Sequence, residues 1–521
     1  MSNVRNLEVP GSQARRVWLK GVSALAAASA IGSLAATRPA QAASKSATAA
    51  ADTGKPLFAY VGTYTPNGLG IHRFQVDRSN GKLEPLEPLR GIENPSSLIV
   101  DRQQRFLFAV SEVKNYNGTS NGSVSAYAIE SGTGTLQLVN TVNSQGAGPV
   151  YLSLHPNGRF LMVANYNSGS VAVFPVSDNG TLGEACSVQQ PQAPGGPQHA
   201  AEGVPGSFAI SDHDGPHAHT IVPSPDGRFA ISTDLGVDRT YIWKFDEATG
   251  ALSPNDPPFV AASPGAGPRH VAFHPNGRYM YEVTEEASTL VCYAYDSAHG
   301  ALTRLQSVST LPDGYQGTSF ASELVFSHDG RFIYVANRLH DTIVQFSVAG
   351  NGHLQRVGEV PTGGDYPRVI KFDPSGRFMY SLNQRSDHIA IFNVDTANGK
   401  LRPTGTYVAV GSPSDIAFAS ALHRGSVCLS ERAAGAWYAR ICRSPELIVR
   451  YARQFRFPKA ESRVAASEAS AEAHRAASVC RRNTPAPGLR PFPATSRVSR
   501  HPRRPPRRAS DRAIPPCAQS P

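Results

Sequence analysis

The stretch "GAGPRHVAFHPNGRYMYEVTEE" places a guanidinium group and a carboxylate at opposite ends of a β-hairpin pattern. Arg269 lies seven residues before Asn276 of the turn, and Glu285 lies eight residues after Gly277. Because the strands of a hairpin run antiparallel, residues equally far from the turn lie at the same end of the pair. A carboxylate can move a proton and a guanidinium can hold an anion, so together they could do acid–base chemistry on a small ligand.

The same spacing recurs in three other segments of the chain. It pairs His219 with Asp234, Glu323 with Arg338, and Arg368 with Asn383, and His217 stands beside the first pair. Any one of these residues could simply stabilise a rim of the fold, and Asp234 or Asn383 could only tie loops together. As a group they predict a functional site, because repeat folds gather binding residues on one face and because clustered charges are costly without compensation.

A repeated pattern of strands must position these residues. Six segments, such as "PVYLSLHPNGRFLMVANY" and "YPRVIKFDPSGRFMYSLNQ", consist of an alternating apolar run, a tight glycine turn and a second β-rich run. The turn glycines are separated by 69, 50, 53 and 46 residues, in the order Gly158, Gly227, Gly277, Gly330 and Gly376. Further runs after each pair bring the unit to four strands in about 50 residues, which is typical of a β-propeller blade.

The two ends of the body supply one more blade. Residues 57–86 contain the second, third and fourth strands of a unit but no first strand, and residues 412–419 read as an isolated first strand. Joining them closes a ring of seven and removes exposed sheet edges. The sequence therefore predicts an all-β fold, a seven-bladed β-propeller over 55–419. Its last blade is closed by N-terminal strands and one C-terminal strand.

The segments that flank the body have a different composition. Residues 1–42 contain Arg15-Arg16, a weakly apolar run and Ala40-Gln41-Ala42, which predicts a twin-arginine-type signal peptide cleaved after Ala42 and followed by a linker at 43–54. The alternative is an uncleaved anchor. Residues 420–521 are rich in Arg, Pro and Ala, which predicts a disordered tail or an out-of-frame translation.

Charge and cysteine content narrow the class of function. Residues 43–420 hold 25 Lys and Arg against 33 Asp and Glu, so the net charge of +10 comes from the flanking segments. The body is therefore not predicted to bind nucleic acid. Its two cysteines, Cys186 and Cys292, show no zinc-ligand spacing, and we favour buried free thiols over a disulfide.

Five segments carry a family resemblance: "GPHAHT", "TDLGVDR", "GAGPRHVAFHPNGRYMYEVTE", "SELVFSHDGRFIYVANR" and "YPRVIKFDPSGRFMYSLNQ". They resemble the lactonase family of seven-bladed propellers, which includes bacterial 6-phosphogluconolactonases and the fungal carboxy-muconate cyclase. The resemblance covers about 55–419. One departure is Leu339, which stands where members of that family often have glycine beside the residue that matches Arg338.

The resemblance implies hydrolysis of a sugar lactone without a metal or another cofactor. The residues that would line the site are His219, with His217 nearby, Arg269, Glu285 and Arg338. Either His219 or Glu285 would be the general acid/base, while Arg269 and Arg338 would bind the anion or oxyanion. Further substrate contacts are expected from His217, Asp234, Glu323, Arg368 and Asn383. A non-catalytic binding propeller and a muconate-type cycloisomerase remain the alternatives.

The expected partner is one small-molecule lactone. If the signal is functional, the protein is a periplasmic monomer that is not inserted in the membrane after cleavage. An exported enzyme would not meet 6-phosphogluconolactone, so an unphosphorylated aldonolactone such as gluconolactone is then the expected substrate.

Overall fold

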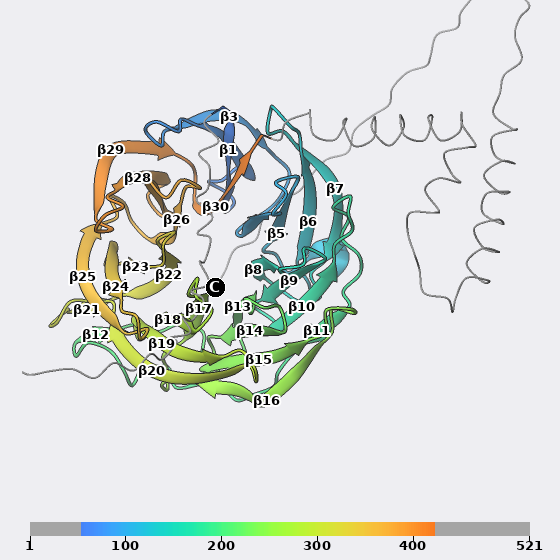
Figure 1. The fold of residues 1–521 in the computed structure, drawn as a ribbon. Helices are drawn as coiled ribbons and strands as arrows, with labels where there is room; N and C mark the ends of the chain where they lie inside the picture. The colour runs from blue at the N-terminus through green and yellow to red at the C-terminus, as the bar shows by residue number, and fades with distance from the viewer. Residues whose placement is uncertain (1–53, 422–521) are drawn as a thin grey trace, which may run out of the picture. The chain divides into compact units, whose positions relative to one another are not determined.

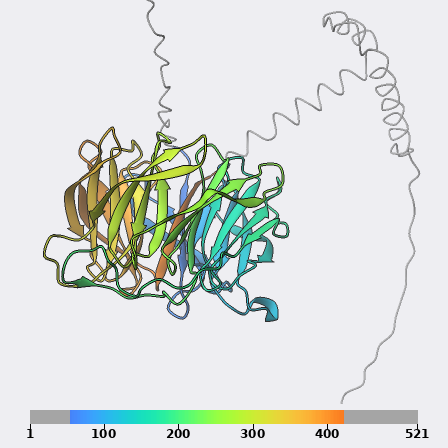
Figure 2. The same ribbon diagram turned by 90° about the horizontal axis from the view of Figure 1, so that it is seen from below.

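The computed structural model describes residues 54–421, so the predicted signal peptide and nearly all of the predicted tail lie outside the described residues. Within this range the chain forms seven four-stranded antiparallel sheets arranged as a ring (Figure 1). Seen from the side, the sheets stand next to one another and their strands run between the two faces of the ring (Figure 2). The predicted all-β, seven-bladed propeller is confirmed.

Each blade is named here from its innermost strand outward. Blade 1 contains β4 (Leu98–Val100), β5 (Phe106–Ser111), β6 (Ser123–Ile129) and β7 (Leu136–Asn143). Blade 2 contains β8 (Pro149–Leu154), β9 (Phe160–Asn165), β10 (Ser170–Pro175) and β11 (Ser187–Gln189). Blade 3 contains β13 (Ala218–Pro223), β14 (Phe229–Asp234), β15 (Arg239–Phe245) and β16 (Leu252–Ala261). Blade 4 contains β17 (Pro268–Phe273), β18 (Tyr279–Thr284), β19 (Thr289–Asp296) and β20 (Ala301–Ser309).

The remaining blades complete the ring. Blade 5 contains β22 (Phe320–Phe326), β23 (Phe332–Arg338), β24 (Thr342–Val348) and β25 (Leu354–Pro361). Blade 6 contains β26 (Pro367–Phe372), β27 (Phe378–Asn383), β28 (His388–Val394) and β29 (Leu401–Ala409). Blade 7 contains β30 (Pro413–Ser420), β1 (Leu57–Thr63), β2 (Ile71–Val76) and β3 (Leu83–Leu89). A short 3-10 helix, η1, spans Tyr116–Gly118.

Blade 7 joins the two ends of the described chain, as predicted. β1 pairs antiparallel with β30 from Leu57 opposite Ser420 to Gly62 opposite Asp415. This pairing completes blade 7 and closes the ring, so no gap is left between the first and the last blade.

The hydrophobic core is divided into seven clusters, each shared by two neighbouring blades. Between blades 1 and 2, for example, Phe108 and Val124 pack against Leu161 and Phe174. A repeated hydrogen bond also crosses from blade to blade, since Tyr380 Oη donates to the carbonyl of Gly81 at 2.7 Å and three other tyrosines make the equivalent contact. The ring therefore holds the innermost strands at fixed positions around the axis.

The turns between first and second strands lie at one rim, and their glycines adopt the left-handed conformation that the hairpins need. The φ angles of Gly158, Gly227, Gly277, Gly330 and Gly376 fall between 68° and 76°. The opposite rim carries the beginnings of the innermost strands and the loops that precede them. One such connection, residues 190–217 between β11 and β13, contains β12 (Ser207–Phe208), which pairs in parallel with β21 (Gly317–Thr318) ahead of blade 5.

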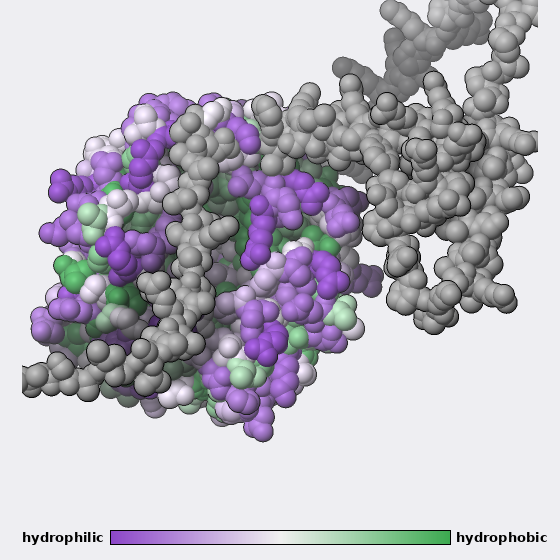
Figure 3. Space-filling view, in the orientation of Figure 1, coloured by the Kyte–Doolittle hydropathy of each residue, from purple (hydrophilic) through white to green (hydrophobic). Residues whose placement is uncertain are grey.

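The outer surface seen in Figure 3 is mostly hydrophilic, with apolar residues scattered over it. Cys186 and Cys292 are both free thiols, as predicted, but Cys186 is exposed, and the expectation that both are buried is wrong for that residue. Cys186 lies just before β11, a short outer strand that leaves its side chain at the surface.

Candidate active site

A β-bulge near the beginning of the innermost strand positions most of the candidate residues. In β17 the register with β18 shifts between Pro268 and His270, so Arg269 is the extra residue. The same shift makes His219 the extra residue in β13 and Arg368 the extra residue in β26. In β22 two residues, Ser322 and Glu323, stand between the paired positions. A bulge bends the strand and redirects side chains that regular alternation would send elsewhere.

The bulges surround one cavity of about 190 Å³ in the central channel. Four of the predicted site residues line it, namely His219, Arg269, Glu323 and Arg368. Deeper in the channel, Lys371 also lines the cavity, and its ammonium group lies 2.8 Å from a carboxylate oxygen of Asp415. The cavity thus has charged groups at two levels, with apolar residues such as Val271, Leu324 and Val369 between them in its lining.

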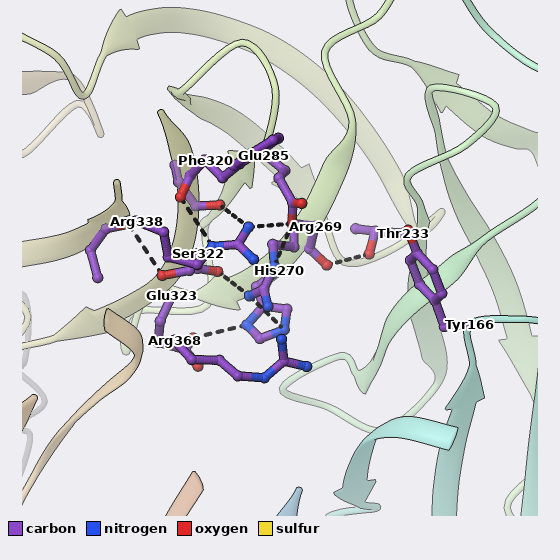
Figure 4. A network of polar contacts seen from close by, with 12 residues as sticks. Tyr166, Thr233, Arg269, His270, Glu285, Phe320, Ser322, Glu323, Arg338 and Arg368 are labelled. Atoms are coloured by element: carbon purple, nitrogen blue, oxygen red, sulfur yellow. Dashed lines mark hydrogen bonds and ion pairs between the residues drawn. The ribbon is translucent and has the colours of Figure 1, made fainter. Parts of the chain in front are cut away.

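Arg269 and Glu285 lie in contact, as their equal distance from the turn predicts. The Nε of Arg269 is 2.8 Å from Oε2 of Glu285, and Nη2 of Arg338 is 2.6 Å from the same oxygen (Figure 4). Burial raises the pKa of Glu285, but Arg338 and Arg269 outweigh it, so the carboxyl pKa is lowered overall. This carboxylate stays ionised between two guanidinium groups.

Other contacts fix both guanidinium groups of this network. Arg269 is only 1% exposed and donates to the carbonyl oxygen of Ser322. Arg338 donates to the carbonyl of Phe320 and to the hydroxyl of Tyr366, at 3.2 Å each. Neither Glu285 nor Arg338 lines the cavity, but both belong to the network that holds the cavity residue Arg269.

His270 is a cavity residue that sequence reasoning missed. Its Nδ1 is 3.1 Å from Oε1 of Glu323, and its Nε2 is 3.3 Å from Nη1 of Arg269 (Figure 4). An ionised Glu323 accepts a hydrogen bond from Nδ1–H, which leaves Nε2 to accept a hydrogen bond from Arg269. Burial lowers the pKa of His270, with Glu323 opposing, so the ring is neutral at pH 7. In the sequence, the only sign of a role for His270 is its position next to Arg269. In a regular strand, neighbouring side chains point to opposite faces, so His270 would point away from Arg269.

The ring of His219 lies at the same mouth and has no hydrogen-bond partner in the described part of the chain. It packs edge-on against His270 at 4.9 Å and against Tyr166 at 5.6 Å. Burial, followed by the charge of Arg269, holds its pKa well below the usual value of 6.5. His219 is therefore a neutral imidazole that faces the cavity at pH 7.

Arg368 differs from the other two arginines because its guanidinium is uncommitted. It stacks over the ring of Tyr64 at 5.0 Å, and its nearest acidic oxygen, on Glu112, is 3.9 Å away. None of its N–H groups has a hydrogen-bond acceptor among residues 54–421. The Glu112 oxygen instead accepts from the hydroxyl of Tyr64 at 2.6 Å. Arg368 therefore offers free donors to an anionic or developing negative oxygen in the cavity.

Three residues that the sequence predicts to contact the substrate do not line the cavity: His217, Asp234 and Asn383. Asp234 accepts from the backbone of His217 at 2.7 Å, and burial raises its pKa to about 6. His217 itself is 2.8 Å from Asp214. Asn383 donates to the carbonyl of Thr362, a contact that Asn165 and Asn337 repeat with the matching loops of other blades. These contacts hold loops, and a role in substrate binding stays a prediction for these residues.

No group of three or more His, Cys, Asp or Glu side chains within residues 54–421 is arranged to hold a metal ion. In the same range, no helix is long and apolar enough to cross a membrane.

Comparison with known proteins defines the class of this propeller. The family described as "Lactonase, 7-bladed beta-propeller" matches residues 58–418. The 6-phosphogluconolactonase of Bacillus subtilis is 32% identical over 361 residues, which cover 69% of this chain and 97% of that protein. The 6-phosphogluconolactonase of Formosa agariphila is 29% identical over 364 residues, with coverages of 68% and 98%.

A solved structure with the same fold is the periplasmic gluconolactonase of Pseudomonas aeruginosa. It aligns with a TM-score of 0.62 and 34% identity over 70% of this chain and 100% of that chain. The fold and the acidic and basic groups around its channel make this protein a propeller enzyme. The chain belongs to the lactonase family of seven-bladed β-propellers, and it is a lactonase.

Proposed function

We propose that this lactonase hydrolyses a sugar lactone to the open-chain acid, with His219 as the general base and Arg368 as the oxyanion binder. The observation that carries the proposal is that both side chains face one small cavity and neither has a hydrogen-bond partner in the described part of the protein. Groups that are buried yet uncommitted are suited to meet a substrate.

The proposed reaction needs no cofactor. Neutral His219 accepts a proton from a water molecule as the water oxygen bonds to the ester carbonyl carbon, and Arg368 stabilises the oxyanion that forms. The tetrahedral species then collapses, the bond to the ring oxygen breaks, and the protonated His219 returns the proton to that oxygen. Arg269 adds positive charge at the cavity wall. Arg338 and Glu285, which the sequence placed among the catalytic residues, hold Arg269 in position in this scheme.

Glu285 is the less suitable base of the two that the sequence suggested. Its carboxylate is held by Arg269 and Arg338, and it does not line the cavity. A carboxylate whose Oε2 already accepts from two guanidinium groups, which lower its pKa, accepts a proton from water poorly.

Export through the twin-arginine route is part of the proposal, and it bears on the substrate. The structural relative from Pseudomonas aeruginosa is a periplasmic gluconolactonase, and the first residues of this chain read as an export signal. A periplasmic enzyme would meet unphosphorylated aldonolactones rather than intermediates of cytosolic sugar-phosphate metabolism. Mass spectrometry of the mature N-terminus tests the export step, and an intact Met1 in the cytosolic fraction contradicts it.

The reaction is tested by following acid release from gluconolactone, 6-phosphogluconolactone and a muconolactone with the full-length protein. We expect hydrolysis of a sugar lactone, and a drop of about 10²-fold or more in kcat/KM for His219→Gln. Because His219 must be neutral to act, kcat/KM should rise with pH through an apparent pKa below 6.5 and be level at pH 7. Turnover of the muconolactone alone, or an unaffected His219→Gln variant, would refute the assignment.

A further inference from the structure

The side chains around the mouth of the channel fall into two arcs of opposite character. Blades 3 to 6 contribute the charged or ionisable residues of the first arc, which are His219, Arg269, Glu323 and Arg368. Blades 7, 1 and 2 contribute small side chains at the matching level of the bulges, and Tyr151 of β8 and Asp415 of β30 line the cavity next to them. Ser414 and Val150 are the extra residues of the bulges in β30 and β8, and Ser97 directly precedes β4. These three residues also line the cavity.

We call Ser97, Val150 and Ser414 the small arc. It makes the cavity asymmetric. At the level of the bulges, blades 3 to 6 project long ionisable side chains, whereas Ser97, Val150 and Ser414 project little, so these three leave more room on their side of the cavity. A bulky residue at any of these three positions would fill it. At about 190 Å³ the cavity is smaller than sites for drug-sized ligands, which span roughly 300–1,000 Å³. Its size suits a single small ring.

One hydroxyl group of the small arc lacks a partner. Ser414 is 0% exposed, it lines the cavity, and its Oγ has no hydrogen-bond partner among residues 54–421. A buried hydroxyl without a partner is costly, so such groups are uncommon unless a ligand or water satisfies them. The small arc is therefore both roomy and able to hydrogen-bond.

The charges around the cavity indicate which kind of ligand can bind beside the small arc. Two of the three cations that line the cavity are paired, since Arg269 contacts Glu285 and Lys371 contacts Asp415. The third cation, Arg368, is 3.9 Å from Glu112, and the proposed reaction uses it for the ester oxyanion. The charged group that blades 7, 1 and 2 bring to the cavity is the Asp415 carboxylate, which is paired with Lys371 and would repel a second anion. A phosphate dianion bound there would lie without a compensating cation, which is unfavourable in a buried site.

We infer that Ser97, Val150 and Ser414 form a subsite for the body of an uncharged, hydroxyl-bearing lactone ring, whose ester group faces Arg368 and His219 across the cavity. This inference rests on the proposed function and adds the residues that select the ring of the substrate. The Ser414 hydroxyl binds a ring hydroxyl, and Val150 sets the room available.

The first experiment compares gluconolactone with δ-valerolactone, the same six-membered ester without hydroxyl groups. Ser414→Ala should lower kcat/KM for gluconolactone about three- to tenfold, the typical effect of one hydrogen bond, and leave δ-valerolactone unchanged. Its Tm should stay the same or rise, because the variant loses a buried hydroxyl that has no partner in the empty protein. A purely structural role for Ser414 would instead change both lactones equally.

The second experiment fills the subsite. Val150→Leu should lower kcat/KM for gluconolactone at least tenfold and affect the bare lactone much less. The matched control is Val222→Leu, at the far end of β13 and outside this cavity. Wild-type protein should prefer gluconolactone to its 6-phosphate at least tenfold. A preference for the phosphate, or equal effects of Val150→Leu on both lactones, would overturn the inference.

Binding of gluconolactam, a stable amide analogue, separates this inference from the proposed function. Calorimetry should detect binding to the wild type and weaker binding to Ser414→Ala, whether or not any lactone is hydrolysed. If the lactam binds in this way but no lactone is turned over, the proposed function fails and the subsite stands. If lactones are turned over but the lactam binds both proteins equally, the subsite fails alone.

Discussion

At the scale of single residues, two arginines at one mouth of the channel have different surroundings. Arg338 contacts the Glu285 carboxylate, the Phe320 carbonyl and the Tyr366 hydroxyl. Within residues 54–421, Arg368 has a 3.9 Å contact with Glu112 and a stacked Tyr64 ring but no hydrogen-bond acceptor. The first arginine is part of a closed network, and the second is held in place with its donors free.

Replacing these two arginines one at a time should therefore have different effects, on stability for Arg338 and on catalysis for Arg368. Arg338→Gln leaves a buried carboxylate with one partner fewer, so its free energy of unfolding should fall by about 3 kcal/mol. Arg368→Gln should change the free energy of unfolding by less than about 1 kcal/mol and lower kcat/KM about 10²-fold. Urea denaturation and steady-state kinetics measure the two quantities. Equal destabilisation by both changes would contradict the assignment.

A third buried group, Glu282 in β18, should make stability depend on pH. It is 0% exposed, accepts hydrogen bonds from Thr240 and Tyr293, and burial raises its pKa to about 7. Between the unfolded value of 4.5 and about 7 the folded protein binds more protons than the unfolded chain. The free energy of unfolding should therefore fall as pH rises through this window, by about 3 kcal/mol.

Glu282→Gln should remove this component of the pH dependence. The variant keeps an uncharged hydrogen-bonding group, so the free energy of unfolding should exceed that of the wild type at pH 8 and match it near pH 4.5. Exposed Glu87→Gln is the control, and it should leave the profile unchanged. Parallel urea-derived profiles for the wild type and Glu282→Gln between pH 4.5 and 8 would show that Glu282 does not titrate in this way.

Counting residues from the hairpin turns found part of the site. It brought Arg269 and Glu285 to one rim, where they lie in contact. It passed over His270 because strict alternation lets only one of two neighbouring residues face the channel, whereas the bulge at Arg269 lets both line the cavity. Equal spacing also selected Asn383, whose position at the end of a second strand serves a repeated loop contact.

At the scale of elements, the turn after β23 contains a residue with an unfavourable backbone conformation. Leu339, next to Arg338, has φ of 70°, in the left-handed region that disfavours large side chains. The sequence resemblance had marked this position as one where glycine is common. The structure supplies the physical reason, since glycine adopts this conformation without strain.

Leu339→Gly should raise the free energy of unfolding by about 1 kcal/mol, because relief of backbone strain outweighs the added flexibility of the unfolded chain. The matched control is Asp341→Gly in the same turn. Asp341 also has positive φ, 56°, but its carboxylate accepts from the backbone of Tyr366 at 2.9 Å. That change should destabilise the protein instead. Urea denaturation of both variants checks the opposite signs, and a destabilised Leu339→Gly would rule out strain at this turn.

Elements were the most predictable level of this structure. Asn-Gly, Asp-Gly and Ser-Gly turns fixed the pairing of first and second strands, and the structure has those pairs. The β12–β21 pairing was not predictable, because its two-residue strands lie in separate connections, one before blade 3 and the other before blade 5. Such short pairs depend on tertiary packing rather than on any local pattern.

At the scale of the whole molecule, stability depends on closing the ring. Each hydrophobic cluster is shared by two blades, so a blade without its neighbour would expose one face of its core. β30 closes the last gap, where Ile416 packs in the cluster between blades 6 and 7 and Ala419 in the cluster between blades 7 and 1. Asp415 on the same strand also accepts from Leu98 and Lys371.

Two truncations should therefore behave very differently although their ends lie ten residues apart. A chain that ends at Ala421 retains β30 and should keep the Tm and the lactonase kinetics of the full-length protein. A chain that ends at Gly411 loses β30, so β1 has an open edge and two core clusters are incomplete; we expect no cooperative thermal transition and no turnover. Near-wild-type melting of the shorter chain would show that the ring does not need β30, and failure of the longer chain would show that residues 422–521 contribute to the fold.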